Sequence, residues 1–203
     1  FIASLEALEK ALADKGVQTI YAFVERAAKM DWCKRICQRT KVYFLSEAKA
    51  RILPKTYQIM RKIYAENDVA IVHTHFELYD IPATVTAPKT AKIFWHLHDA
   101  LKENYNKAST TRKILTKLQY SMLHSRAFML SVSEEHAAFA NVLGFPKGRT
   151  VYCPNGINIS RIQPLTKPKK DGYFLQFGWE VVRKGVDLVI QAVQLVKSPN
   201  MHV

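Results

Sequence analysis

The sequence predicts an α/β protein in which parallel strands form a sheet covered by helices. Three observations lead to this prediction. Short apolar runs of strand length alternate along the chain with stretches of helical periodicity. The runs are apolar at nearly every position, as in strands that are buried on both faces. Hydrophobic residues make up 48% of the 203 residues, which excludes a disordered chain and provides for a core.

The expected elements follow one another in a regular order over residues 1–158. A helix over 1–15 carries leucines at helical spacing and ends at Gly16, a residue type that commonly closes helices. Strands are expected over 17–24, 41–45, 69–75, 93–98, 128–133 and 150–153, and helices over 53–64 and 134–143, with a partly helical stretch through residue 123. This alternation is typical of a doubly wound, Rossmann-like domain.

A change of composition after residue 158 predicts a linker over 159–172, which holds two prolines and little that is apolar. A strand over 173–177, a loop over 178–184 and an amphipathic helix over 186–196 follow it. One strand and one helix cannot bury their own apolar faces. We therefore expect 173–203 to be the start of a second domain, truncated in this sequence.

The basic residues are unevenly distributed. The chain has 30 Lys and Arg against 17 Asp and Glu, a formal net charge of +13. Eleven basic residues lie over 26–62 against two acids, and six lie over 102–126 against one. Such a field attracts nucleic acid, anionic lipid or a phosphorylated substrate, or it is only a solvated surface. No nucleic-acid-binding signature accompanies it, and no apolar run approaches the ~18 residues of a membrane span.

The cysteine pattern indicates reduced thiols. The chain has three cysteines, and Cys33 and Cys37 lie four residues apart, as neighbours on one helix. An odd number at this spacing favours a cytoplasmic protein over a disulfide scaffold.

Two His-x-His pairs, His73 with His75 and His96 with His98, end two of the expected strands. Residues two apart on a strand lie on one face, and open α/β sheets bind ligands at the carboxyl ends of their strands. Four imidazoles at one edge could hold a metal ion. They could equally hydrogen-bond to neighbouring backbone groups. Asp80 and Asp99 are nearby acids, but no recognised metal-ligand spacing appears.

A phosphate-binding candidate lies near the end of the sequence. An expected strand ends at Gly178, a loop carries Arg183 and Lys184, and a helix begins near Val186. A helix N-terminus with two adjacent cations suits a diphosphate, although Arg-Lys in a surface turn is often only solvated. A Walker loop is absent.

Several segments carry a family resemblance in their order and spacing. They are His73–His75, Trp95–Asp99, Ser131–His136, Pro154–Asn158, and Phe177-Gly178 followed by Arg183–Asp187. Together they resemble the retaining GT-B glycosyltransferases known as group 1 or family 4, over nearly the whole chain. The resemblance implies the GT-B fold: residues 1–158 as the acceptor-side Rossmann-like domain, with its first strand missing, and 173–203 as the start of the nucleotide-sugar-binding domain.

The resemblance also implies roles for individual residues. His98 is the expected catalytic residue, beside the transferred sugar, and Gly178, Arg183 and Lys184 are expected to bind the donor diphosphate. The residues expected to line the cleft or the acceptor side are His73, His75, Asp99, Glu134, Asn155 and Gly156. No cofactor and no metal ion are expected, because the nucleotide-sugar is a substrate and the two cations take the place of a metal.

The implied function is transfer of a sugar from a nucleotide-diphosphate donor to a glycan or polyprenyl-linked acceptor, in bacterial polysaccharide or cell-envelope glycan synthesis. The basic residues over 26–62 are expected to hold a cytoplasmic protein to the anionic inner membrane surface, with no nucleic-acid partner. Trp179 replaces the family's usual Arg and Asn158 its usual Asp. The donor pocket is incomplete, so these 203 residues alone are expected to be inactive. A metal-dependent hydrolase using the His-x-His pairs and a non-catalytic basic binding module are the alternatives.

Overall fold

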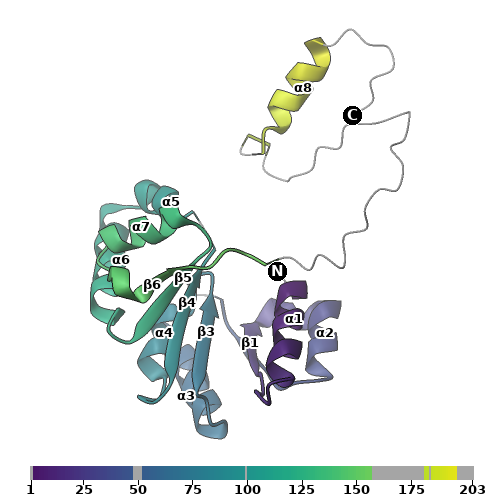
Figure 1. The fold of residues 1–203 in the computed structure, drawn as a ribbon, viewed down its shortest axis with the longest axis vertical. Coiled ribbons are helices and arrows are strands. Elements are labelled where there is room, and N and C mark those ends of the chain that lie inside the picture. Colours follow the sequence, from purple (N-terminus) through teal and green to yellow (C-terminus); the bar gives the residue numbers. More distant parts are fainter. Residues whose placement is uncertain (1, 48–51, 99, 157–180, 183, 196–203) are drawn as a thin grey trace. The chain divides into compact units, whose positions relative to one another are not determined.

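The computed structural model describes residues 2–47, 52–98, 100–156, 181–182 and 184–195. The chain divides into two compact units, residues 1–158 and 159–203. The first unit carries parallel strands and the helices around them (Figure 1). In the second unit the described helix is α8 (Val186–Leu195). The linker expected over 159–172 and the strand expected over 173–177 lie outside the described residues.

The strands of the first unit are all parallel, which confirms the predicted α/β class. β1 (Tyr21–Val24) pairs with β2 (Val42–Leu45). A four-stranded sheet has the order β3 (Ile71–His75), β4 (Lys92–Leu97), β5 (Ala127–Ser131) and β6 (Thr150–Tyr152). The strands thus form two sheets rather than one, because no strand of the described residues is hydrogen-bonded between β1 and β3.

The helices of the first unit differ from expectation mainly where they are short. They are α1 (Ile2–Ala13), α2 (Asp31–Cys37), α3 (Pro54–Glu66), α4 (Asp80–Thr86), α5 (Leu101–Lys107), α6 (Thr110–Leu123) and α7 (Glu134–Val142), with 3-10 turns at Glu25–Lys29 and Lys147–Arg149. α2 and α4 have seven residues each, too few to show a helical period in the sequence. A helix cap can be recognised in the sequence at the start of α7, where the Ser133 side chain accepts a hydrogen bond from the backbone N–H of His136.

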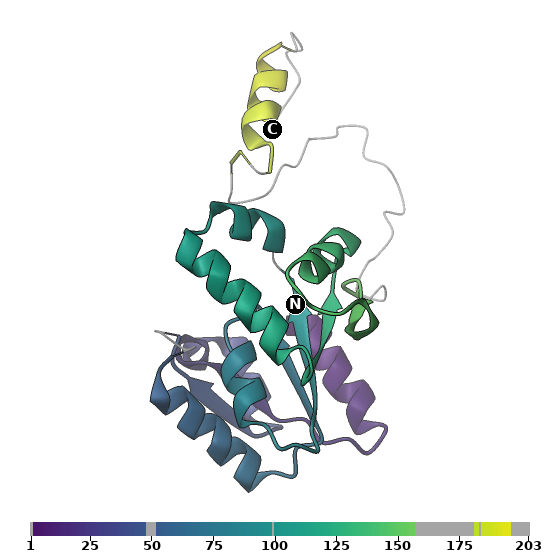
Figure 2. The same ribbon diagram turned by 90° about the vertical axis from the view of Figure 1, so that its left-hand side faces the viewer.

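One face of the four-stranded sheet builds the core, and helices α4 and α6 cover that face (Figure 2). Trp95 of β4 packs against Tyr120 of α6 and against Phe145, with ring centroids 6.0 and 5.7 Å apart. Its indole N–H donates to Thr84 of α4 at 2.9 Å. The other face is not buried to the same degree, contrary to the expectation of strands buried on both faces: Ile71 of β3 is 58% exposed.

Phe145→Ala tests the importance of this aromatic cluster. Phe145 is 1% exposed, and its loss leaves a cavity beside Trp95 and Tyr120. We expect the free energy of unfolding to fall by about 3–5 kcal/mol. Val142→Ala is the control, because Val142 is 73% exposed and its truncation should change stability by less than about 0.5 kcal/mol. Urea denaturation followed by circular dichroism measures both, and equal losses would contradict this account of the core.

Candidate active site

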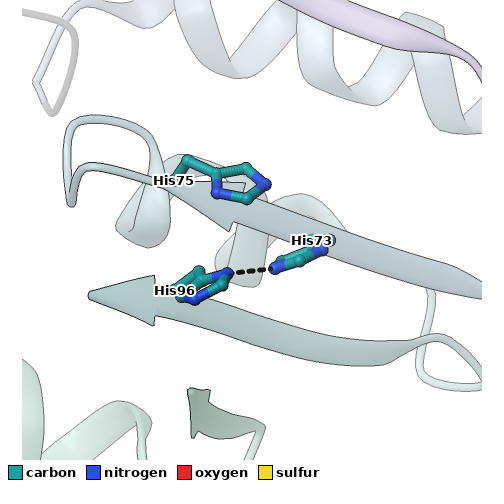
Figure 3. Close-up of side chains that lie close together, drawn as sticks. All are labelled: His73, His75 and His96. Atoms are coloured by element: carbon teal, nitrogen blue, oxygen red, sulfur yellow. Dashed lines mark hydrogen bonds between the residues drawn. The ribbon is translucent and has the colours of Figure 1, made fainter. Parts of the chain in front are cut away.

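Four histidines come together at the carboxyl ends of β3 and β4. The register of this parallel pair sets His75 opposite His96. His73 Nε2 lies 3.1 Å from His96 Nδ1, and His75 Nδ1 lies 2.9 Å from His98 Nε2. Figure 3 shows three of these side chains, with His73 and His75 on one strand and His96 on its neighbour. The two His-x-His pairs therefore form one cluster, in which each ring of one pair hydrogen-bonds to a ring of the other.

The imidazole rings also pack on one another. The ring centroids of His96 and His98 are 4.1 Å apart, and those of His73 and His75 are 4.3 Å apart. The Phe76 ring packs against His98 with its centroid 4.7 Å away and its plane tilted by 31°. His73 remains exposed, whereas His75 and His96 are partly buried. The cluster is thus open to solvent through His73, and an aromatic ring contacts it at His98.

This packing keeps the imidazoles uncharged at neutral pH. Burial, and then repulsion from the neighbouring imidazoles, lowers the pKa of His73 to about 4, of His75 to about 3 and of His98 to about 4. Burial also lowers the pKa of His96, against an opposing effect of the Cys153 backbone, although Nε2 of His96 has no hydrogen-bond partner of good geometry among the described residues. Neutral imidazoles can accept hydrogen bonds from substrate hydroxyl groups.

The ends of β5 and β6 bring further predicted residues to the same edge. The backbone N–H of Val132 donates to Leu97 O at 3.3 Å, and that of Cys153 donates to Ser131 O at 2.7 Å. Glu134 follows as the first residue of α7. Asn155 hydrogen-bonds to the His98 side chain, which opposes the lowering of its pKa. His98, Glu134 and Asn155 thus belong to three consecutive strand ends, as expected for a ligand-binding edge.

Two residues that the sequence analysis does not single out belong to this edge. Phe76 and Glu77 directly follow β3 and have φ angles of 63° and 55°, a left-handed conformation that is uncommon for side chains of this size. The Tyr120 hydroxyl donates to Glu77 Oε1 at 2.9 Å and so links this turn to the core. Backbone strain of this kind is concentrated at functional sites. No residue pattern in the sequence marks it.

The remaining predicted residues are distributed over both units. Gly156 accepts a hydrogen bond from the Ser4 hydroxyl at 3.3 Å. Lys184 lies two residues before α8 in the second unit. Asp99, Gly178 and Arg183 lie outside the described residues, so the diphosphate site expected around Lys184 is described only in part. A metal could be held by His73, His75 and His96, since one ligand nitrogen from each lies within 4.8 Å of the others.

The fold and its polar edge define a Rossmann-like domain with a ligand-binding edge at the carboxyl ends of its strands. Residues 3–161 match the family model of Glycosyltransferase Family 4. The match spans more than half of the chain, and the chain belongs to this family; it is a glycosyltransferase chain. A search of curated proteins finds no match. Within the described residues, no helix is long and apolar enough to cross a membrane.

The lowered pKa values predict a destabilisation by acid. Between pH 6.5 and about 4 the unfolded chain binds protons that the folded cluster excludes, so the free energy of unfolding falls as the pH falls. Each imidazole contributes at most about 1.4 kcal/mol per pH unit, and the solvent-accessible His73 contributes less. Above pH 6.5 the imidazoles are neutral in both the folded and the unfolded chain, so they no longer make the free energy of unfolding depend on pH.

Urea denaturation across this pH range, with a chelator present, measures the effect. The double variant His73→Gln/His75→Gln should show a weaker pH dependence than the parent protein. Identical pH profiles would show that these imidazoles are not held neutral by the fold.

Proposed function

We propose that the intact protein transfers a sugar from a nucleotide-diphosphate donor to a glycan or lipid-linked acceptor, with retention of the anomeric configuration. The proposal depends on one observation above all: the His98 ring is held in place at the carboxyl end of β4 in a chain of this glycosyltransferase family. His75 and Asn155 hydrogen-bond to its ring and Phe76 packs against it. An imidazole fixed in this way can hydrogen-bond to a hydroxyl group of the transferred sugar or of the acceptor.

In the proposed reaction the bond between the anomeric carbon and the diphosphate breaks, and the electron pair leaves with the diphosphate oxygen. The acceptor hydroxyl oxygen forms the new bond to the anomeric carbon, and its proton passes to the departing diphosphate. In the proposal, Lys184 and Arg183 neutralise the charge that develops there, next to Gly178. Removing one such fixed contact typically costs ~3 kcal/mol in the transition state. These cations make a catalytic metal ion unnecessary. His73, His75, Asp99, Glu134, Asn155 and Gly156 would line the cleft on the acceptor side.

Two substitutions test this assignment in the intact protein. His98→Gln should lower kcat for sugar transfer by about a hundredfold, since the hydrogen bond to the reacting groups is lost. His124→Gln is the matched control, because His124 caps α6 and belongs to no strand end. Sugar transfer from radiolabelled donors measures both. A rate for His98→Gln equal to that of the control would refute the role of His98.

A thermal-shift panel of UDP-, GDP- and ADP-sugars tests the donor site separately. A ligand at ~100 times its Kd stabilises a protein by about 2.7 kcal/mol, and thus raises Tm by a few degrees. We expect a shift with one nucleotide and its loss in Lys184→Ala. A well-folded intact protein whose Tm responds to none of the nucleotides would contradict the proposed donor class.

We further propose that the protein associates with an anionic membrane surface, where polyprenyl-linked acceptors lie. The sequence predicts this association from the excess of basic residues over 26–62. Acidic residues from other segments compensate part of that positive charge. Arg39 forms ion pairs with Glu6 and Glu9 of α1. Glu66 of α3 pairs with both Lys41 and Lys62. The positive electrostatic field of residues 26–62 is therefore weaker than the number of basic residues in this segment indicates.

Helix α6 adds a second feature that suits a lipid surface. Its outward side chains include large apolar residues with high exposed fractions: Ile114 (55%), Leu115 (61%), Leu118 (47%) and Met122 (71%). Arg112 and Lys117 are exposed on the same helix. Apolar residues flanked by cations are typical of helices that lie in the interface of an anionic membrane.

Vesicle co-sedimentation tests this association. Leu115→Ser/Leu118→Ser should lower binding to phosphatidylglycerol vesicles at least tenfold. The reason is that two apolar side chains no longer insert into the membrane, where each CH₂ contributes about 0.8 kcal/mol. Val142→Ser, at an apolar position on α7 that is more exposed than either leucine, should bind as the parent does. Equal binding of the parent protein to neutral and anionic vesicles at low salt would contradict the proposal.

A further inference from the structure

The imidazole cluster has the geometry of a metal site as well as that of a sugar-binding edge. His73 Nε2 and His96 Nδ1 are 3.1 Å apart. In a tetrahedral zinc site with Zn–N bonds of about 2.0–2.1 Å, two ligand nitrogens lie about 3.3 Å apart. The separation of these two nitrogens therefore already suits one shared ion, and the rings need only turn so that both lone pairs point to it. His75 offers a third nitrogen within 4.8 Å.

The protein backbone fixes these three ligands in advance. His73 and His75 lie on one face of β3, and the parallel register sets His96 of β4 beside them (Figure 3). The hydrogen-bonded sheet thus holds the ligands in place, so that few degrees of freedom are lost when an ion binds. The exposure of His73 gives an ion access from solvent, and a fourth position can take water.

A second observation concerns His96. Its Nε2 is buried and has no hydrogen-bond partner of good geometry among the described residues. The hydrogen bond between His73 Nε2 and His96 Nδ1 can form with the proton on either ring. When Nδ1 ligates an ion, the proton that lies between His73 and His96 can move to the other nitrogen of its ring, and each ligating nitrogen uses its lone pair.

We propose that His73, His75 and His96 bind one divalent transition-metal ion of the Zn²⁺ class, and that the bound ion inhibits sugar transfer. Three imidazoles select Zn²⁺, Ni²⁺ or Cu²⁺ over Mg²⁺, which requires oxygen ligands. The inhibition follows from the contact between His75 Nδ1 and His98 Nε2 at 2.9 Å, because a ring that turns to ligate the ion no longer positions His98. This second part depends on the proposed function, whereas the binding of the ion does not.

The binding is tested on the intact protein after dialysis against EDTA. Isothermal titration with ZnCl₂ should give one site per chain, and MgCl₂ should give none. Replacing Zn²⁺ by Co²⁺ should give the visible absorption of a tetrahedral Co²⁺ complex. His73→Gln and His96→Gln should each weaken the zinc site at least tenfold while the circular dichroism spectrum stays unchanged.

Two controls exclude other sources of zinc affinity. Cys37→Ser removes the exposed thiol of α2, and His124→Gln removes a histidine outside the cluster; neither should alter the titration. An absence of one-to-one zinc binding, or a titration that His73→Gln and His96→Gln leave unchanged, would overturn the metal site.

Activity measurements separate the metal site from the proposed function. Stoichiometric Zn²⁺ should abolish sugar transfer and EDTA should restore it. Whatever activity His73→Gln has in EDTA should be unchanged when the same concentration of Zn²⁺ is added to that variant. Full activity of the zinc-loaded parent protein would overturn the inhibitory part. A chain that binds zinc through these histidines but transfers no sugar from any donor, with or without the metal, would instead refute the proposed function and leave the metal site standing.

Discussion

The parallel pairing of β3 with β4 is the constraint on which both the core and the candidate site depend. Side chains alternate between the two faces of a strand, and the burial of Ile93, Trp95 and Leu97 fixes which face of β4 meets the helices. His96, which lies between Trp95 and Leu97 in the sequence, therefore lies on the opposite face of β4. A slip of one residue would bury the imidazole and expose Trp95. The hydrophobic pattern that builds the core therefore also assembles the histidine cluster.

The core and the site are further connected through Tyr120. Its ring packs against Trp95, while its hydroxyl group holds the carboxylate of Glu77. Left-handed conformations of non-glycine residues cost on the order of 1–3 kcal/mol each and persist only where the surroundings fix them. The turn at Phe76 and Glu77 meets this condition, because one of its side chains is anchored in the core and the other packs against His98. The position of Phe76 beside His98 thus depends on Tyr120 of α6.

The sequence was sufficient to predict the features that depend on local pattern. The apolar runs located β3, β4 and β5 to within a few residues, because buried strands need consecutive apolar side chains. Features that depend on distant partners were not predictable in this way. The split into two sheets depends on which strands pair, and the compensation of Arg39 depends on acids thirty residues away in the chain. The backbone angles of Phe76 and Glu77 follow from packing alone.

The chemistry of the cluster follows from the packing of its rings on one another. Burial and repulsion between neighbouring imidazoles lower the pKa values and favour the uncharged form. The rings are packed against one another and against Phe76, and in the uncharged form each ring has one nitrogen lone pair. Such lone pairs are needed both to accept a hydrogen bond from a sugar hydroxyl and to ligate a transition metal. The two uses compete for the same nitrogens. Under the two proposals, an edge of neutral imidazoles that binds an uncharged sugar is therefore, by the same property, sensitive to zinc.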